Sequence, residues 1–331
     1  MSGLTFVDVC SGAGGLALGL ERAGFEPRLL LDDDEDAVTT LRTNRPHWNV
    51  LHTDLLEFDP QDHPESYDVD LLSAGLPRVR SSATVARSDS RVEERLLKAT
   101  VYLVHAIKPR VLLIENVPGL ADSDDHQEFH DFARDELAHL GYRFSWFVLN
   151  AVDFGVPQNR KQGILMALKV DRTGAFHEPM PTVREPVTVG AALGPSMASR
   201  GWSDAVRWAA QASRPAPTLV GGSKNRGGAD LGPTGAKNTW ATMGVNAGSL
   251  GDEIPGSDFV WDPALGRDGM VRITVEQAAL LQSFPPSWEI SGRKTSRYRQ
   301  VGHATPPPVG EALGRAVAEA LEADSATSAA G

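Results

Sequence analysis

A glycine-rich turn near the N-terminus is the first segment whose residue types suggest binding chemistry. It follows an apolar strand-like run, Phe6–Val9, and precedes a helix-like segment at residues 16–23. Glycine lets a backbone turn sharply and approach a ligand, and the first turn of a helix offers unpaired N–H donors. Such turns hold several nucleotide-containing cofactors, and some hold none. The candidate binding residues are Cys10, Ser11, Gly12, Ala13, Gly14 and Gly15.

Two acidic residues further along could complete a site for a nucleoside. Asp32 ends the second strand-like run, where a carboxylate can accept hydrogen bonds from ribose hydroxyls. Asp54, followed by Leu55, ends a third short run, where it could accept from an adenine amino group. Each acid alone is more often a helix cap or a solvated loop residue. Their order after the glycine turn is what favours a cofactor containing adenosine.

Alternating strands and helices position these residues. Several short apolar runs are separated by helix-like patterns. One of these helix-like patterns extends from Leu96 to Ile107 and ends before Pro109. This alternation predicts a largely parallel sheet with helices on both faces, in a first domain at residues 1–170. The strand-like runs are Phe6–Val9, Arg28–Leu31, Val69–Ser73, Val111–Ile114, Phe144–Leu149 and Gly163–Leu168.

The chain changes character near residue 171. Residues 171–270 are rich in Gly, Pro, Ser and Asn and show little periodicity, which predicts a small irregular or β domain. Residues 271–322, with helical patterns at 274–283 and 306–321, are expected to return to the first domain. The small polar tail at 323–331 is expected to be disordered.

Bulk properties narrow the function classes. A single cysteine, Cys10, excludes a disulfide framework or a cysteine-based zinc site within the chain. The net charge of −11 is not that of a general nucleic-acid binder, although residues 171–270 have nine Lys and Arg against ten Asp and Glu. No apolar run approaches the ~20 residues that span a bilayer, so a cytoplasmic protein without a membrane partner is expected.

Six blocks in order resemble the DNA cytosine-C5 methyltransferase family over nearly the whole chain. The glycine turn and the two acids match its cofactor motifs. The segments that match its later motifs are Glu115-Asn116-Val117, Gln158-Asn159-Arg160-Lys161-Gln162, Arg272–Pro285 and Gly302-His303-Ala304-Thr305-Pro306. The family's target-recognition domain lies before the last two blocks, so residues 171–270 correspond to it.

The resemblance implies a fold, a cofactor and a substrate. The fold is the α/β class I S-adenosylmethionine-dependent methyltransferase fold, a Rossmann-like mixed sheet with a small target-recognition domain. The cofactor is S-adenosylmethionine. The resemblance adds His303 and Ala304 to its binding residues. It also adds Asp33, which stands where the family places an apolar residue beside the adenine. The substrate is double-stranded DNA with a flipped cytosine, in DNA methylation and restriction-modification. No metal is implied.

The family's catalytic cysteine is absent. In the family, a thiolate adds to cytosine C6 while a glutamate hydrogen-bonds the protonated N3, which makes C5 nucleophilic. The matching loop reads Ala74-Gly75-Leu76-Pro77-Arg78-Val79-Arg80-Ser81-Ser82, with Arg78 in place of that cysteine. Arginine stays protonated and offers only donors, so it cannot replace a thiolate.

Other departures surround the same pocket. Gln162 stands where the family has a second arginine, which helps to hold the flipped cytosine, whereas Arg160 is kept. His303 replaces an asparagine. Without a thiolate opposite it, Glu115 is either the partner of cytosine N3 or a structural ion-pair partner of Arg160 or Arg78, and the sequence leaves both open.

The sequence therefore supports three functions. The first is methylation of cytosine in DNA, for which the family resemblance implies Glu115 and Arg160 as catalytic residues. The second is a catalytically silent paralogue that binds DNA or cofactor, or that is a partner subunit of an active methyltransferase; the missing nucleophile favours it. The third is methyl transfer to another acceptor through Glu115 or Ser82.

Overall fold

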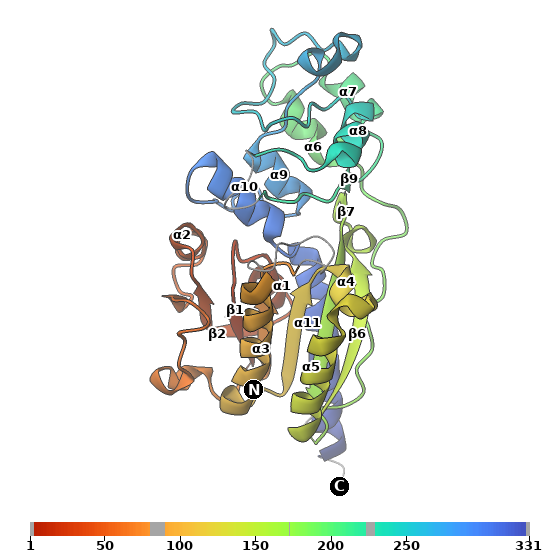
Figure 1. Ribbon diagram of the computed structural model, residues 1–331. Coiled ribbons are helices and arrows are strands. Elements are labelled where there is room, and N and C mark those ends of the chain that lie inside the picture. The colour runs from red at the N-terminus through yellow and green to blue at the C-terminus, as the bar shows by residue number, and fades with distance from the viewer. Residues whose placement is uncertain (1–2, 80–89, 172, 223–228, 329–331) are drawn as a thin grey trace. The chain divides into compact units, whose positions relative to one another are not determined.

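The structure is a computed structural model that describes residues 3–79, 90–171, 173–222 and 229–328 (Figure 1). Two compact units make up the chain. Unit 1 comprises residues 1–149, 161–180 and 309–331, and unit 2 comprises residues 150–160 and 181–308.

Unit 1 contains a seven-stranded sheet in the order β3-β2-β1-β4-β5-β8-β6. β1 to β5 pair in parallel, and β8 runs antiparallel to β5. Its elements are β1 (Leu4–Val9), α1 (Gly15–Arg22), β2 (Phe25–Asp32), α2 (Glu35–Asn44), β3 (Val50–His52), β4 (Leu71–Gly75), α3 (Ser90–Ile107), β5 (Val111–Asn116), α4 (Pro118–Asp122), α5 (Gln127–His139), β6 (Tyr142–Asn150), β8 (Lys161–Lys169) and α11 (Pro307–Ser328). All six predicted strands are confirmed.

The order of the strands reverses between β1 and β4. β1 pairs with β2 on one side and with β4 on the other. In open α/β sheets, ligands bind at the carboxyl ends of the strands at such a switch point. The turn after β1 begins with Cys10, so the glycine-rich turn lies at this switch point.

The central strands are buried on both faces, which explains their nearly continuous apolar sequences. All six residues of β5 are buried. On one face, Val7, Val9 and Ile114 pack in one core with residues of α3 and α5. Figure 1 shows α3 and α5 in front of the strands and α11 behind them. A Cβ on Gly310 of α11 would lie 2.9 Å from the backbone oxygen of Leu16, so α1 and α11 pack closely.

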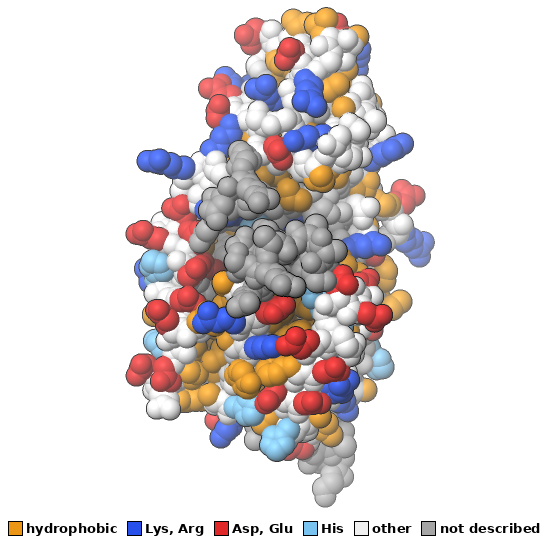
Figure 2. Space-filling model, in the orientation of Figure 1, with side chains coloured by type: hydrophobic (Ala, Val, Ile, Leu, Met, Phe, Trp, Pro, Cys, Tyr) orange, Lys and Arg blue, Asp and Glu red, His pale blue; other side chains and the backbone are white. Residues whose placement is uncertain are grey.

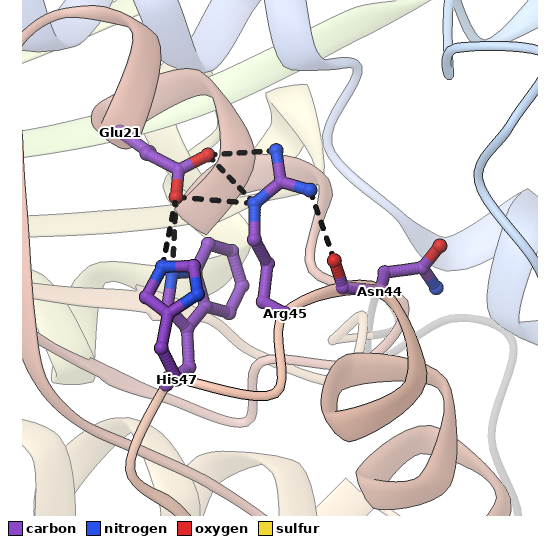
Figure 3. A network of polar contacts seen from close by, with 5 residues as sticks. Glu21, Asn44, Arg45 and His47 are labelled. Carbon is purple, nitrogen blue, oxygen red and sulfur yellow. Dashed lines mark hydrogen bonds and ion pairs between the residues drawn. The ribbon is translucent and has the colours of Figure 1, made fainter.

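A polar network holds the end of α1 to the segment after α2 (Figure 3). The Glu21 carboxylate accepts from Arg45 Nε at 2.9 Å, from another guanidinium nitrogen of Arg45 at 2.8 Å and from Trp48 Nε1 at 3.1 Å. His47 Nε2 lies 3.8 Å from the same carboxylate. Because α1 begins at the glycine-rich turn, this network fixes the helix that carries the turn.

Replacing Glu21 with alanine is expected to lower the free energy of unfolding by about 1–2 kcal/mol, because charge-assisted hydrogen bonds to half-exposed groups are lost. Urea denaturation of the two proteins measures the difference. The matched control is Glu128→Ala, which removes a carboxylate that is 88% exposed and pairs with Lys98. An equal loss in both variants would contradict a special role for Glu21.

Unit 2 is largely helical and irregular. Its only described sheet pairs two strands of two residues each. A capping box, in which Thr274 and Gln277 hydrogen-bond each other's backbone, begins the predicted helix at 274–283. The elements are β7 (Gln158–Asn159), α6 (Val189–Ala198), α7 (Ala205–Gln211), β9 (Ala216–Pro217), α8 (Thr234–Thr242), α9 (Val275–Leu281) and α10 (Lys294–His303).

The compact units differ from the domain boundaries expected from the sequence. Residues 271–308 group with unit 2, and the chain returns to unit 1 at Val309 instead of near residue 271. The reason is that α9 packs against both α6 and α10. Residues 150–160 also group with unit 2. At the other end, α11 continues to Ser328, past the expected start of a disordered tail at residue 323.

Charge is divided unevenly between the units. Unit 2 has 14 Lys and Arg against 11 Asp and Glu, a net charge of +3, which leaves −14 for unit 1 out of the total of −11. Asp and Glu side chains are numerous among those coloured in Figure 2, and Lys and Arg are interspersed with them. No helix in the described ranges is long and apolar enough to cross a membrane.

Candidate active site

The glycine-rich turn has the backbone geometry that its sequence predicts. Cys10, Gly12 and Gly14 all have positive φ, at 54°, 54° and 79°. Gly14 N–H donates to Ser11 O at 2.8 Å, and Gly14 then caps α1. A Cβ on Gly12 would have no heavy atom within 4 Å. The turn thus presents backbone to open space at the carboxyl end of β1.

Asp32 is hydrogen-bonded to this turn. One carboxylate oxygen accepts from Gly12 N–H at 2.7 Å, and the other accepts from Asp34 N–H at 2.9 Å. The side chain is buried, and this burial raises the pKa of Asp32 to about 6. The sequence predicted an acceptor for ribose at this position. It did not show that the same carboxylate also fixes the backbone of the turn.

The remaining cofactor candidates of unit 1 lie beside the same edge of the sheet. Asp33 is exposed, and its carbonyl oxygen is 3.2 Å from His52 Nε2. Asp54 is half-buried and accepts from Leu56 N–H at 2.8 Å, and Leu55 is buried. His303 is exposed and Ala304 is buried, and both belong to unit 2.

The electrostatics of this edge favour a cation. Burial raises the pKa of the Cys10 thiol, and the carboxylates of Asp32, Asp33, Asp8 and Asp54 raise it further. Cys10 therefore stays a neutral thiol near neutral pH. S-adenosylmethionine carries a positive sulfonium and an ammonium group, so the surrounding acids suit that cofactor. The described residues contain no group of three or more His, Cys, Asp and Glu side chains that could hold a metal ion.

Asp8 is a buried acid that the sequence analysis did not single out. Its side chain is fully buried and accepts from Ser73 Oγ at 2.5 Å. Burial raises the pKa of Asp8 to about 7, against the hydrogen bonds from Ser73 and Ser11. Asp8 lies inside β1, and its sequence neighbours give no sign of this role, because the contact with Ser73 depends on the pairing of β1 with β4.

Stability is expected to fall as pH rises from about 4 to 7. The folded-state pKa of Asp8 is raised to about 7, so folding favours the protonated acid, and the associated stability is present below the unfolded pKa and lost at higher pH. The change is on the order of 4 kcal/mol at most. Asp8→Asn should make the fall in stability smaller, and the raised pKa of Asp32 accounts for part of the fall that is left. The exposed control Asp62→Asn should leave the profile unchanged, as denaturation at pH 5 and 8 would measure. Parallel profiles for all three proteins would contradict the assignment.

Asn116 fixes the loop that follows β4. Its Oδ1 accepts from Val79 N–H at 3.0 Å, and its Nδ2 donates to Leu76 O at 3.3 Å and Pro77 O at 3.2 Å. These contacts lie on both sides of Arg78. The backbone around Arg78, which stands at the position of the family's nucleophile, is therefore held by hydrogen bonds to the buried side chain of Asn116. The Glu115-Asn116-Val117 motif alone did not reveal this role of Asn116.

Glu115 and Gln162 meet beside this loop. Glu115 is 5% exposed, and Gln162 is 1% exposed. Gln162 Nε2 donates to Glu115 Oε1 at 2.7 Å. Burial lowers the pKa of the Arg78 guanidinium, and the negative charge of Glu115 opposes that shift. The structure thus brings Glu115 and Gln162 into contact in unit 1, and the charge of Glu115 acts on Arg78. Ser81 and Ser82 lie outside the described residues.

Arg160 is engaged within unit 2. Its buried guanidinium donates to Leu219 O at 3.1 Å, to Gly302 O at 3.0 Å and to His303 O at 3.3 Å. Gln158 lies in the same unit and accepts from Leu219 N–H at 2.8 Å. A structural role of Arg160 is visible in these contacts, and its catalytic role stays a prediction from the motif.

The sheet order and the site geometry define the fold as that of the S-adenosylmethionine-dependent methyltransferases. A solved structure of a protein encoded within an Escherichia coli prophage has a TM-score of 0.68 at 22% identity, covering 96% of this chain and 99% of that chain. The structure of a Spodoptera frugiperda DNMT2 mutant has a TM-score of 0.64 at 17% identity, covering 96% and 100%. At these identities the likeness concerns the fold alone.

The family model described as C-5 cytosine-specific DNA methylase matches residues 4–319. The chain therefore belongs to the C-5 cytosine-specific DNA methylase family, as its motifs predicted. It is 41% identical to the type II methyltransferase M.NaeI of Lentzea aerocolonigenes, over 97% of this chain and 76% of that protein. It is 36% identical to the type II methyltransferase M.NgoMIV of Neisseria gonorrhoeae, over 96% and 98%.

Proposed function

We propose that this protein binds S-adenosylmethionine and double-stranded DNA without itself methylating cytosine. The observation that carries the proposal is Arg78. It occupies the position of the family's nucleophile, on a loop that Asn116 holds in place, with its guanidinium in the field of Glu115.

The residues of unit 1 fit the cofactor. The turn at Gly12 offers backbone facing open space, and Asp32 and Asp54 stand at the strand ends where ribose and adenine acceptors are needed. The acids around Cys10 suit the cationic end of the molecule. S-adenosylmethionine would supply an activated methyl group there. His303 and Ala304 of unit 2 are assigned to the cofactor from their motif.

The chain's own residues cannot supply the covalent step of cytosine methylation. Only a thiolate-like nucleophile adds readily to cytosine C6 near neutral pH, and the sole cysteine is Cys10 of the glycine turn. Its raised pKa keeps it protonated. Removal of a catalytic nucleophile costs ~10⁶ in rate in a well-studied case, and a loss of that order is expected here.

DNA binding is supported by unit 2 and by the relatives. Unit 2 has a net charge of +3 although the whole chain is acidic. The relatives at 41% and 36% identity are type II methyltransferases. Because phosphate contacts release counterions, the affinity for duplex DNA is expected to fall as salt rises. In the same role of binding DNA and cofactor, the chain could act with a partner subunit that contributes the nucleophile.

Methylation of DNA cytosine by the chain itself is the competing function, and the high identity to M.NaeI favours it. It requires a nucleophile that the described residues near Glu115 do not include. The two functions share cofactor and DNA binding and differ only in methyl transfer, so binding experiments test what they have in common.

Calorimetric titration with S-adenosylmethionine and S-adenosylhomocysteine tests the cofactor part of the proposal. Binding of S-adenosylmethionine with a dissociation constant on the order of 1–100 µM is expected, a range that corresponds to about 5–8 kcal/mol. The uncharged sulfide product should bind more weakly, because the site is acidic. A folded sample that binds neither compound would exclude every methyl-transfer role for the isolated chain and leave a scaffold role.

A further inference from the structure

The C-terminal end of α10 is held by side chains from elsewhere in unit 2. The last carbonyl groups of a helix have no partner within the helix, so other donors must satisfy them when they are buried. Here they receive hydrogen bonds from two fully buried side chains, Arg160 and Gln282. The carbonyl groups that accept belong to Val301, Gly302, His303 and Ala304.

Arg160 contributes charge as well as hydrogen bonds. Its guanidinium donates to Gly302 O at 3.0 Å and to His303 O at 3.3 Å. The positive charge lies at the negative end of the α10 dipole, where a cation is favourable. Gln282 Nε2 donates to Val301 O at 2.7 Å. A cation and an amide together therefore fix the end of α10.

The same network holds a second segment of unit 2. Gln158 Nε2 donates to Gln282 Oε1 at 2.9 Å, and Gln158 Oε1 accepts from Leu219 N–H at 2.8 Å. Arg160 donates to Leu219 O at 3.1 Å. Both backbone groups of Leu219 are thus engaged. Three buried side chains therefore tie the segment at Leu219 to the end of α10.

Glycines let this second segment lie directly against α10. A Cβ on Gly302 would lie 2.2 Å from Gly221 N, and a Cβ on Gly221 would lie 2.9 Å from Arg299 O. Gly221 also has a φ of 72°, a left-handed conformation that other residues rarely adopt. Because the two backbones are in contact, a shift at the end of α10 would displace the segment at Gly221 as well.

We infer that Arg160, assisted by Gln282, is a positioning residue for the cofactor that acts through the backbone of His303 and Ala304. The inference rests on the proposed function, in which His303 and Ala304 are assigned to S-adenosylmethionine from their motif. A fully buried guanidinium with three hydrogen bonds to backbone carbonyl groups is suited to hold the main chain rather than to contact a substrate.

Calorimetric titration with S-adenosylmethionine separates positioning from folding. The dissociation constant depends on the geometry of the site, whereas the stoichiometry gives the fraction of folded protein. Arg160→Met removes the donors, Arg160→Lys keeps the charge and some donors, and Gln282→Met removes the amide. The matched control is Asn246→Ala, which removes another buried side chain of unit 2 that binds backbone, donating to Arg267 O at 2.9 Å.

Arg160→Met is expected to raise the dissociation constant of S-adenosylmethionine about 30-fold, because charge-assisted hydrogen bonds are lost. Arg160→Lys should bring it back to within about fivefold of the natural chain, since an ammonium can still donate to these carbonyl groups. Gln282→Met should raise it about fivefold, because its hydrogen bonds are neutral. Asn246→Ala should lower the melting temperature but keep the dissociation constant within about twofold of the natural value.

A folded Arg160→Met protein with an unchanged dissociation constant would overturn the inference. An equally large loss in Arg160→Lys would overturn it, since the retained charge and donors would then have no effect. An equally large loss in Asn246→Ala would overturn it too, because any destabilisation of unit 2 would then weaken binding. A natural chain that binds no S-adenosylmethionine would instead contradict the proposed function, and the inference with it.

Hydrogen exchange of the natural chain covers the case in which the variants do not fold. Leu219 belongs to no cofactor motif, but its N–H is bonded within the network. Saturating S-adenosylmethionine is expected to slow exchange of this N–H at least about fivefold, because a ligand at the end of α10 stabilises what is tied to it. The reference is Gly248 N–H, which donates to Asn246 Oδ1 outside the network. Exchange at Leu219 that changes no more than at Gly248 would overturn the inference.

Discussion

Combining Arg78→Cys with Gln162→Arg is expected to produce methyl transfer to cytosine, whereas either substitution alone should stay close to background. Arg78→Cys supplies the thiol but removes the cation beside Glu115, and Gln162 is neutral. Gln162→Arg returns the positive charge next to Glu115, because the present amide already donates to that carboxylate at 2.7 Å. Both changes are therefore expected to be needed, one for the thiol and one for the positive charge beside Glu115.

The expected gain of the double variant over Gln162→Arg alone is about 10⁴-fold or more, since only the double variant has a nucleophile, which is worth ~10⁶ in rate. Incorporation of labelled methyl from S-adenosylmethionine into duplex DNA measures it. The control is Arg78→Ser with Gln162→Arg, which has the same charge but no thiol. Full activity of Arg78→Cys alone would contradict the need for Gln162→Arg, and a silent double variant that binds DNA and cofactor would place the defect elsewhere.

Asp32→Ala is expected to weaken S-adenosylmethionine binding by about 100-fold. Asp32 is assigned two tasks: it is the proposed ribose acceptor, and it holds Gly12 N–H at 2.7 Å, which shapes the turn. Loss of a charge-assisted hydrogen bond costs about 1.5–3 kcal/mol, and a disordered turn adds to that cost. Calorimetric titration measures the change in dissociation constant.

The matched control for Asp32 is Asp62→Ala, which removes the same charge from an exposed position of unit 1. Its affinity should stay within about threefold of the natural chain, because exposed charges are screened by solvent. Similar losses in both variants would mean that net charge, and not the geometry of the turn, governs cofactor binding. An Asp32→Ala protein with unchanged affinity would remove Asp32 from the site.

The sequence predicted the strands of the sheet because buried parallel strands are short apolar runs with polar ends. It also located the glycine turn and Asp32, since both are defined by their position at the end of a strand. The pairing of Glu115 with Gln162 could not be derived in this way. It depends on the antiparallel register of β5 and β8, which brings residues 47 positions apart into contact.

The organisation of unit 2 was harder to predict. The Gly- and Pro-rich region at 171–270 suggested irregular or β structure, yet α6, α7 and α8 lie within it. Its helices are short, and their burial depends on packing, as when α6 packs against α7 and α9. Contacts between helices that are far apart in the sequence cannot be predicted from local sequence patterns. For the same reason the return of the chain to unit 1 lies at Val309 and not near residue 271.

Single-turnover methyl transfer by the natural chain tests directly whether the protein itself methylates cytosine in DNA. The purified protein, in excess over random-sequence duplex DNA and saturated with labelled S-adenosylmethionine, is incubated for hours and the DNA is digested to nucleosides. We expect no label in 5-methylcytosine above that of a protein-free sample, because Arg78 cannot add to cytosine C6. Label in 5-methylcytosine that scales with protein and disappears in Glu115→Gln would contradict it and show that the chain is an active methyltransferase.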